Sequence, residues 1–294
     1  MTSIGFIGLG IMGSPMAANL VRAGFDVVGY DLTPAALARL SADGGTVGES
    51  VATIAADSDV LISMLPNHPQ VEAVAFGADG ILANAKPGLL YIDMSSIRPE
   101  TSRRIAEEAV GHGVRVLDAP VSGGEKGAID GVLSIMGGGA EDDFAAAAPV
   151  FAPLGKTIVH VGPYGAGQTV KAANQLVVGG TYALVAEAIV LLEAAGVDAG
   201  TGLDVLAGGL AGSRILELKR KSMVAREFAP GFRIDLHHKD MGIVLAAARE
   251  ADVALPVGGL VAQLIAAART QGYGSLDHSA LLKVAENLSA HQKG

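Results

Sequence analysis

A lysine and two amide side chains occur within one stretch, GPYGAGQTVKAANQ, at residues 162–175. Lys171 precedes Asn174 by three positions and Gln175 by four, so on a helix all three share one face. A primary amine beside amides can act as a general acid that protonates a carbonyl oxygen. The alternative is a solvent-exposed lysine at the start of a helix, and the spacing alone leaves both interpretations open.

The glycines of this stretch match most of a phosphate-binding loop, G-x-x-x-x-G-K-[ST]. Gly162, Gly167 and Thr169 occupy their places in that pattern, but Gln168 stands where the lysine is required. A nucleotide hydrolase would also need a magnesium-binding acid after a strand. We therefore do not expect this stretch to hold the phosphates of a nucleotide.

A second glycine pattern, G-x-G-x-x-G, begins at Gly8 and directly follows an apolar run that is typical of a buried strand. Gly8 would allow a tight turn, Gly10 would let the backbone approach a pyrophosphate, and Gly13 would let the next helix pack closely. Ile11 and Met12 lie just before that helix, whose N-terminus offers N–H groups and a positive dipole end to phosphates. The pattern predicts a dinucleotide site.

An acidic residue, Asp31, ends the second predicted strand. A carboxylate at this place can accept hydrogen bonds from both ribose hydroxyls of NAD. It would repel the 2′-phosphate of NADP, and the following Leu32 and Thr33 provide no arginine to hold that phosphate. We expect NAD as the cofactor, with NADP as the alternative.

Three further loops follow predicted strands, where ligands bind in an α/β sheet. Leu65 and Pro66 lie in the first loop and could form a wall of the cofactor site, and Ser96 in the second could donate a hydrogen bond. The third loop contains Ser122 and the Gly123-Gly124 pair. A hydroxyl beside closely spaced backbone N–H groups could bind a carboxylate; a plain turn is the alternative for each loop.

The elements that position these loops alternate in the first half of the chain. Strands are predicted at Ile4–Gly8, Phe25–Tyr30, Val60–Met64, Leu89–Ile92 and Val114–Leu117. Helices are predicted between them, at Ser14–Ala23, Pro34–Leu40 and Glu100–Gly111. This alternation predicts a parallel, doubly wound sheet of the Rossmann type with helices on both faces.

From Thr169 onward the pattern is almost only helical. Helices are predicted at Thr169–Ala195, Gly200–Ala207, Ser213–Met223, His238–Glu250, Val257–Thr270 and Ser279–Ser289. We expect three parts: a dinucleotide-binding domain (1–163), a long interdomain helix (164–195) and an all-helical C-terminal domain (196–294). The fold class is therefore α/β plus all-α, with the substrate site and the oligomer contacts involving the second domain.

Composition excludes several classes of function. The 294 residues carry a formal net charge of −9 and no cysteine. The acidity gives no general attraction to nucleic acid or to an anionic membrane, and we expect the basic run 219–221 to be a solvated helix face. Disulfides and thiol catalysis are excluded. The N-terminal MTSIGFIGLG does not look like a signal peptide, so we expect a cytoplasmic protein.

Two further alternatives concern membranes and metals. The apolar segment 176–196 is long enough to span a bilayer, but it contains Glu187 and Glu193, so we expect a helix of a soluble fold. His237 and His238 are adjacent and would point in different directions on a helix. We therefore expect no metal site there.

Taken together, the motifs resemble those of the β-hydroxyacid dehydrogenase family over nearly the whole chain. GFIGLGIMG is similar to the cofactor motif of this family, DAPVSGG to its substrate-carboxylate motif, GAGQTVKAANQ to its catalytic-lysine motif and FRIDLHHKD to its C-terminal cofactor motif. The family usually has an acid six residues after the aspartate of its Lys-Asp pair, where this chain has Ala246.

The resemblance implies a role for each matching residue. Lys171 would be the general acid/base, Asn174 and Gln175 would orient the substrate, and the Ser122 loop would bind its carboxylate. Phe232 would lie near the nicotinamide and Lys239 would reach the cofactor. A homodimer or homotetramer built on the helical domains is also implied, with a small semialdehyde or hydroxyacid as substrate.

Within the family, GGLAGSRIL, APGFRIDLHHKD and LDHSALL look most similar to the tartronate semialdehyde reductase (2-hydroxy-3-oxopropionate reductase) branch. That branch implies reduction of 2-hydroxy-3-oxopropanoate to D-glycerate with NADH, in glyoxylate metabolism. The alternative is 3-hydroxyisobutyrate dehydrogenase or another short β-hydroxyacid dehydrogenase. Imine reductases share the general plan but commonly lack this lysine, and a non-catalytic nucleotide-binding module would not need Ser122, Lys171 and Asn174 together.

Overall fold

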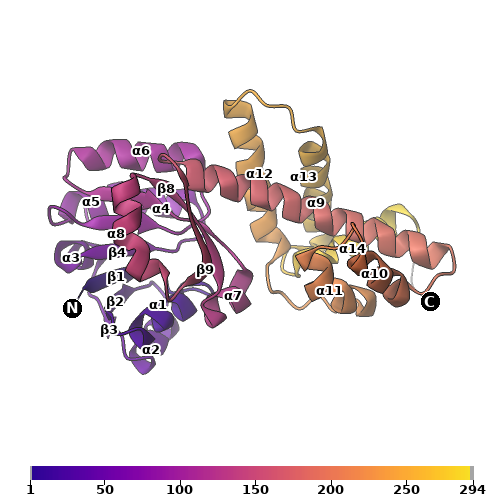
Figure 1. Ribbon diagram of the computed structural model, residues 1–294, viewed down its shortest axis with the longest axis horizontal. Coiled ribbons are helices and arrows are strands. Elements are labelled where there is room, and N and C mark those ends of the chain that lie inside the picture. The colour runs from indigo at the N-terminus through magenta and orange to yellow at the C-terminus, as the bar shows by residue number, and fades with distance from the viewer. Residues whose placement is uncertain (1, 292–294) are drawn as a thin grey trace. The chain divides into compact units, whose positions relative to one another are not determined.

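The computed structural model describes residues 2–291, and the chain forms two compact units, Met1–Lys171 and Ala172–Gly294 (Figure 1). The first unit contains a nine-stranded sheet and the second is helical. Helix α9 (Ala166–Ala194) begins in the first unit and continues into the second, over roughly 44 Å at about 1.5 Å per residue. These features confirm the predicted fold class; the domain boundaries at 163 and 195 stay predictions.

The sheet of the first unit contains all five predicted strands and four more. The strands are β1 (Ser3–Ile7), β2 (Asp26–Tyr30), β3 (Thr46–Val47), β4 (Val60–Ser63), β5 (Leu90–Asp93), β6 (Arg115–Asp118), β7 (Val121–Ser122), β8 (Leu133–Gly139) and β9 (Gly155–Gly162). Their spatial order is β3-β2-β1-β4-β5-β6-β8-β7, with β9 paired to β8. Neighbours from β3 to β6 are parallel, which is the doubly wound pattern.

The end of the sheet beyond β6 differs from the fully parallel sheet that the sequence predicts. Strand β8 runs antiparallel to β6 and β7 and parallel to β9. Its sequence LSIMGGG is rich in glycine, which has low strand propensity. A Cβ on Gly137 would lie 2.1 Å from the Phe144 ring, and one on Gly138 would lie 2.5 Å from Asp118 Oδ1. Close packing therefore requires these glycines. Because they lower the strand propensity, the sequence pattern did not predict β8.

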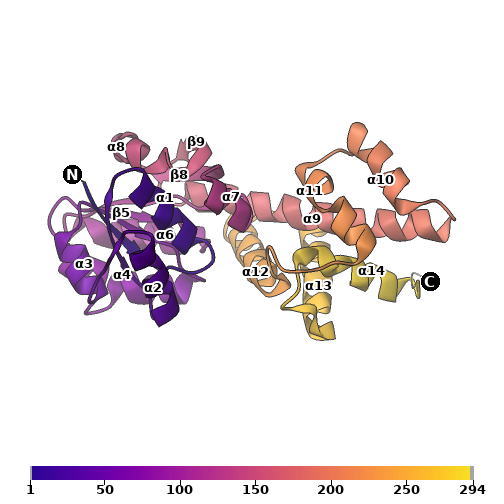
Figure 2. The ribbon, with the colours of Figure 1, turned by 90° about the horizontal axis from the view of Figure 1, so that it is seen from below.

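Helices cover both faces of the sheet (Figures 1 and 2). They are α1 (Gly13–Arg22), α2 (Pro34–Ala42), α3 (Val51–Asp57), α4 (His68–Phe76), α5 (Ile81–Asn84), α6 (Pro99–Val110), α7 (Gly124–Asp130) and α8 (Glu141–Phe151). Two hydrophobic clusters result. Leu90 and Ile92 of β5 belong to the cluster with Met16 of α1, and Tyr91 between them belongs to the cluster with Ile105 of α6.

The second unit packs its helices along α9 (Figure 2). They are α10 (Ala199–Gly208), α11 (Arg214–Ala225), α12 (Ile234–Glu250), α13 (Pro256–Ala268), a π-helical turn η1 (Arg269–Tyr273), a 3₁₀ turn η2 (His278–Ala280) and α14 (Leu281–Leu288). Helix α12 begins at Ile234, four residues before the predicted start, so both His237 and His238 lie on it. Buried Tyr182, Ala186 and Ile189 place α9 in the core of this unit.

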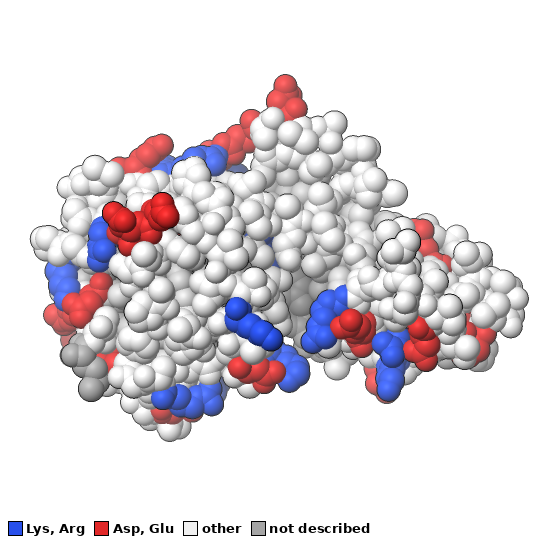
Figure 3. Space-filling model, viewed as in Figure 1, with Lys and Arg blue, Asp and Glu red and all other residues white. Residues whose placement is uncertain are grey.

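By length and composition alone, α9 could cross a membrane, and 44% of its most apolar window is buried. The core helix of a folded domain meets the same criteria, and its buried residues fit that explanation. On the face shown in Figure 3, Lys and Arg side chains lie among Asp and Glu side chains. That neither membranes nor nucleic acids bind the chain stays a prediction.

Candidate active site

The glycine-rich turn between β1 and α1 has the geometry of a pyrophosphate-binding turn. Gly8 has a φ of +94°, and a Cβ on it would lie 2.5 Å from the backbone oxygen of Met64. A Cβ on Gly13 would lie 1.9 Å from the backbone oxygen of Gly8, so α1 can pack here only through glycine. A Cβ on Gly10 would meet nothing within 4 Å, and no side chain caps α1. Both features fit a phosphate group at this helix N-terminus.

Asp31 is held against this turn. Its Oδ2 accepts a hydrogen bond from the backbone N–H of Leu9 at 2.7 Å, and its Oδ1 accepts one from Thr33 N–H at 2.7 Å. The carboxylate therefore has a fixed orientation beside the glycine motif. The next side chain, Leu32, is 87% exposed, and Ile11 in the turn is 57% exposed. Met12, which precedes α1, packs partly against the core.

The loops after β4 and β5 are joined to each other and to the turn. The backbone N–H of Leu65 donates to Ser95 Oγ at 2.8 Å. The Leu65 side chain lies against the turn, 2.9 Å from where a Cβ on Gly8 would be. Pro66, next to it, is exposed, and Ser96 is half-buried. The predicted cofactor residues Leu65 and Ser96 thus lie on loops that one hydrogen bond connects.

The first turn of α9, which precedes Lys171, is anchored by a buried carboxylate at the end of β6. Asp118 accepts hydrogen bonds from the backbone N–H groups of Gly165 at 2.8 Å and Gln168 at 2.9 Å. These groups lack helical partners at a helix start, so Asp118 caps α9 from a distant strand. Burial raises the pKa of Asp118 to about 6, although both N–H donors lower it, and the charge of Asp93 raises it further.

Gln168, which occupies the place of a phosphate-loop lysine, joins α9 to the loop that carries Ser96. Its side chain is 1% exposed. Its Oε1 accepts from the N–H of Ile97 at 3.0 Å, and its Nε2 donates to the backbone oxygen of Ser95 at 2.8 Å. A glutamine can make both bonds because it offers an acceptor and a donor. A lysine offers only donors, so the tertiary structure explains the departure from the phosphate-loop pattern.

The glycines around this turn allow the close approach. Gly165 has a φ of +86°. A Cβ on Gly167 would lie 2.3 Å from the backbone oxygen of Met136 and 2.7 Å from that of Asp118. Glycine is therefore required for packing α9 against β6 and β8, whereas a phosphate loop would need it to approach a ligand.

The loop at Ser122 leads into α7, which is connected to α1, the helix that follows the glycine-rich turn. Ser122 ends β7 and is half-buried, and the next residues, Gly123 and Gly124, have φ values of +141° and +62°. Such backbone conformations favour glycine. The side chain of Asn19 on α1 donates to the backbone oxygen of Ala128 on α7 at 2.8 Å. The predicted carboxylate-binding loop and the glycine-rich turn are thereby fixed to the same helix.

Lys171 is buried, with 8% of its surface exposed, which excludes the solvent-exposed lysine as the alternative in this structure. Asn174 and Gln175 follow it on α9. Asn174 Nδ2 donates to Gln175 Oε1 at 2.8 Å, and Gln175 Nε2 donates to Asp240 Oδ2 on α12 at 2.5 Å. Lys239 Nζ lies 2.8 Å from Asp240 Oδ1. Four polar side chains of the second unit therefore form one chain of contacts.

The loop that carries Phe232 is fixed by a buried aspartate. Asp277 Oδ2 accepts from the backbone N–H groups of Gly231 at 2.9 Å and Phe232 at 3.1 Å, and from Lys219 Nζ at 2.9 Å. Asp277 Oδ1 accepts from the Ser279 hydroxyl at 2.6 Å. Burial raises the pKa of Asp277, but the charge of His278, the Ser279 hydroxyl and Lys219 lower it to about 2.

The predicted site residues thus form two groups. In the first unit, hydrogen bonds or packing connect the glycine turn, Asp31, Leu65, Ser96, Ser122 and the start of α9. In the second unit, side-chain contacts through Asp240 connect Asn174, Gln175 and Lys239. Sequence reasoning did not single out Asp118, Gln168, Asp240 or Asp277 as functional. Each of these four residues lies in a motif that the sequence analysis recognised. Their roles were missed because their hydrogen-bond partners are far away in the sequence. Within residues 2–291, no group of three or more acidic or histidine side chains could hold a metal ion.

Comparison with known proteins places both units in one family. Residues 3–162 match the NAD binding domain of 6-phosphogluconate dehydrogenase, and residues 165–285 match the NAD-binding domain of NADP-dependent 3-hydroxyisobutyrate dehydrogenase. The 2-hydroxy-3-oxopropionate reductase of Escherichia coli is 42% identical over 289 residues, covering 98% of this chain and 99% of the relative. The 2-(hydroxymethyl)glutarate dehydrogenase of Eubacterium barkeri is 41% identical over 287 residues, covering 97% and 95%.

A solved structure has the same fold. The 3-hydroxyisobutyrate dehydrogenase of Mycobacterium tuberculosis, determined with L-serine, superposes with a TM-score of 0.88 at 37% identity, covering 97% of this chain and 99% of that one. The glycine turn, the oriented Asp31 and these matches assign a nicotinamide cofactor. The chain belongs to the 3-hydroxyisobutyrate dehydrogenase-like family and is an NAD(P)-dependent β-hydroxyacid dehydrogenase.

Proposed function

We propose that the protein reduces tartronate semialdehyde to D-glycerate with NADH and that Lys171 is the general acid. The observation that carries the proposal is the anchored start of α9. Lys171 is buried there, three and four residues before two amides that can orient a substrate. Asp118 and Gln168 hold this turn in place with four hydrogen bonds of 2.8–3.0 Å.

A nicotinamide bound at the glycine-rich turn would supply the hydride that the aldehyde carbon of the substrate accepts. The residues of the chain bind and orient the substrate and supply the proton. Ser122 and the N–H groups of Gly123 and Gly124 bind the carboxylate. Lys171 donates its proton to the carbonyl oxygen as the negative charge develops there, and the amide of Asn174 helps to orient that group.

The substrate is assigned from the branch to which the sequence is most similar. The stretches at 208–216, 229–240 and 276–282 carry that similarity, and the E. coli relative named 2-hydroxy-3-oxopropionate reductase is 42% identical. The relative named 2-(hydroxymethyl)glutarate dehydrogenase is 41% identical, so a β-hydroxyacid with a longer chain is the second candidate. A further member of the family, 3-hydroxyisobutyrate dehydrogenase, is the third.

A substrate panel tests the assignment. Tartronate semialdehyde, methylmalonate semialdehyde, succinic semialdehyde and glyoxylate are compared by kcat/KM with NADH, and 2-(hydroxymethyl)glutarate is tested with NAD⁺ in the reverse direction. We expect tartronate semialdehyde to have the highest kcat/KM. Equal turnover of all compounds, or a clear preference for 2-(hydroxymethyl)glutarate, would overturn the substrate assignment.

The role of Lys171 is tested by Lys171→Ala. Loss of a general acid typically lowers the rate of the chemical step by about 10²- to 10⁴-fold. We expect a fall in kcat of that size with an NADH dissociation constant, measured by nicotinamide fluorescence, within about twofold of wild type. Full turnover by this variant would exclude Lys171 as the proton donor.

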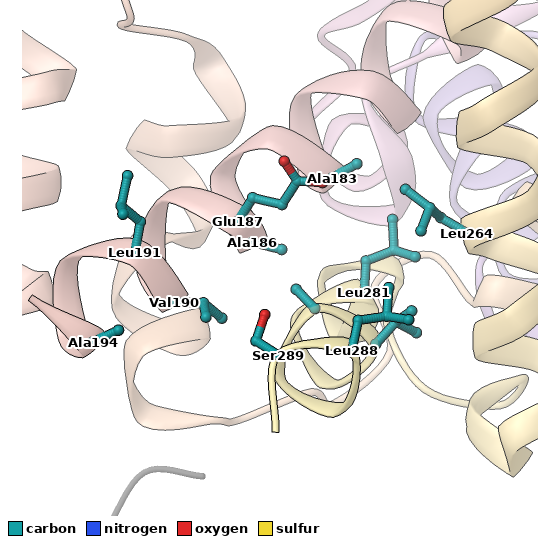
Figure 4. A pocket seen from close by; sticks show the side chains of 12 residues that line it. Ala183, Ala186, Glu187, Val190, Leu191, Ala194, Leu264, Leu281, Leu288 and Ser289 are labelled. Atoms are coloured by element: carbon teal, nitrogen blue, oxygen red, sulfur yellow. The ribbon is translucent and has the colours of Figure 1, made fainter. Parts of the chain in front are cut away.

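We also propose a homo-oligomer built on the second unit. A cavity of about 450 Å³ lies between α9, α13 and α14, and apolar side chains form most of its lining (Figure 4). Leu184 and Leu191 on α9 and Leu288 on α14 are 68%, 71% and 74% exposed, an apolar surface that a second copy would cover. Light scattering of wild type and Leu191→Glu tests this; a monomeric wild type would refute it.

A further inference from the structure

Two buried imidazoles in the second unit contact each other. His237 on α12 and His278 in η2 are 0% and 8% exposed, and their Nδ1 atoms are 3.0 Å apart. They belong to the stretches APGFRIDLHHKD and LDHSALL, which are far apart in the sequence and both resemble the reductase branch. The proposed reaction uses neither imidazole for proton transfer, so their close contact needs another explanation.

The partners of His237 fix the direction of the hydrogen bonds. Its Nε2 lies 3.1 Å from the backbone oxygen of Gln175 on α9. A carbonyl oxygen only accepts, so Nε2 of His237 carries the hydrogen. In a neutral His237, Nδ1 is then the acceptor, and Nδ1 of His278 donates to it. The direction of donation is therefore from His278 to His237 and from His237 to Gln175.

The position of His278 is fixed in turn. Its ring centroid lies 3.9 Å from that of Tyr182 and 5.3 Å from that of Phe232. The neighbouring Asp277 is held by Ser279, Lys219 and the loop before α12, as described above. Because η2 is anchored in this way, His278 is a rigid donor, and it fixes the tautomer and the ring orientation of His237.

The approach of His237 to α9 depends on one glycine. A Cβ on Gly179 would lie 3.1 Å from Nε2 and 3.3 Å from Cε1 of His237, and 2.9 Å from Cγ1 of Val261. A glycine in a helix interior costs roughly 1 kcal/mol relative to alanine. On the adjacent Gly180, a Cβ would meet only Val261 Cγ2, at 4.0 Å. Space for the imidazole is thus required at position 179 and is not required at position 180.

Helix α12 holds Gln175 a second time, one turn after His237. Because Asp240 is a carboxylate and only accepts, the Nε2 end of Gln175 must face it, and Oε1 must face Asn174. Asn174 therefore donates through Nδ2 to Gln175 Oε1. Backbone and side chain of Gln175 are both fixed by α12, and the orientation of the Asn174 amide follows from them.

We propose that His237, oriented by His278, is a positioning residue that fixes Gln175 and, through it, the amide of Asn174. This inference rests on the proposed function, in which those two amides orient the substrate. It assigns a common purpose to the two histidine-containing stretches: one provides the imidazole that contacts α9, and the other sets the tautomer of that imidazole.

The matched pair Gly179→Ala and Gly180→Ala tests the proposal. Each adds one methyl group to the same helix, but only the first places that group against His237, and also against Val261. We expect Gly179→Ala to lower kcat/KM at least tenfold for the best substrate of wild type, while the NADH dissociation constant stays within about twofold. Gly180→Ala should keep kcat/KM within about twofold. Equal kcat/KM values for the two variants would overturn the proposal.

A second pair separates positioning from loss of packing. In His237→Gln the side-chain amide can still donate near the Nε2 position, whereas His237→Leu removes the donor. We expect His237→Gln to retain several times more kcat/KM than His237→Leu at equal Tm. Leu203→Ala, a buried change in α10, controls for general destabilisation of the unit. Equal loss in both His237 variants would show that the hydrogen bond has no positioning role.

The tautomers can be measured without any substrate. Long-range ¹⁵N–¹H correlation spectra of the imidazoles should show hydrogen on Nε2 of His237 and on Nδ1 of His278; the reverse assignment would overturn the inference. Absence of turnover by wild type on the whole substrate panel would instead overturn the proposed function. The two failures are therefore distinguishable.

Discussion

The Asp118 carboxylate caps the helix that carries Lys171: its Oδ2 accepts the backbone N–H of Gln168 at 2.9 Å, across 50 positions of sequence. Its Oδ1 accepts the N–H of Gly165 at 2.8 Å. These hydrogen bonds fix the start of α9 to the end of β6. The position of Lys171 depends on a strand as much as on its own helix.

This cap should have a measurable pH dependence. The pKa of Asp118 is raised by burial to about 6, above its ordinary value of 3.8. The folded state therefore binds this proton more tightly than the unfolded chain, and the stabilisation from Asp118 is full below about pH 4 and is lost as the pH rises through 6. Asp118→Asn cannot titrate. We expect the stability of wild type relative to Asp118→Asn to fall by about 1 kcal/mol from pH 5 to pH 7.5 in urea unfolding. A relative stability that rises over this range would contradict the assignment.

Asp277 should have the opposite pH dependence. Its pKa is lowered to about 2, because the charge of His278, the Ser279 hydroxyl and Lys219 outweigh the effect of burial. A lowered pKa gives stability that is present above about pH 4 and is lost as the pH falls toward 2. We expect Asp277→Asn to be destabilised at pH 7 by roughly 2 kcal/mol or more, and this deficit should shrink as the pH is lowered from 4 to 2.5. A deficit that does not depend on pH in this range would refute the role of the charge.

Two glycines should respond differently to alanine. A Cβ on Gly10 meets nothing within 4 Å, whereas one on Gly167 would lie 2.3 Å from the backbone oxygen of Met136. We expect Gly10→Ala to keep the wild-type Tm and to weaken NADH binding about tenfold or more, because the methyl group occupies the place of the pyrophosphate. Gly167→Ala should lower the Tm by several degrees, since β8 or α9 must move. Calorimetry and NADH fluorescence check both, and unchanged NADH affinity in Gly10→Ala would place the pyrophosphate elsewhere.

Asp31 should determine the choice between NAD and NADP. Its carboxylate is fixed by Leu9 and Thr33, and Leu32 beside it is exposed. We expect wild type to prefer NADH, because the 2′-phosphate of NADPH would meet this charge. The double change Asp31→Ser and Leu32→Arg should shift the ratio of kcat/KM values toward NADPH by at least tenfold. Leu32→Arg alone is the control, and a wild type that prefers NADPH would overturn the role of Asp31.

The sequence by itself determined the features that depend on local geometry. The G-x-G-x-x-G turn is readable because the tight turn, the open space at Gly10 and the close packing at Gly13 each require glycine. The shared face of Lys171, Asn174 and Gln175 is readable because helix periodicity fixes it. The alternation of five strands with helices, followed by helices only, predicted the fold class in the same way.

Only the tertiary structure decided which side chains hold these features in place. Asp118 meets the start of α9, Gln168 meets the loop after β5, and His237 meets both His278 and Gln175. Strand β8 could not be predicted from the sequence, because its glycines have low strand propensity. They are required instead for close packing against Phe144 and Asp118. Except for Gly137 with Phe144, each of these contacts joins residues that are 20 or more positions apart. A local sequence pattern has no information about pairs at that separation. Buried polar groups must still find partners, and the folded chain provides them at a distance.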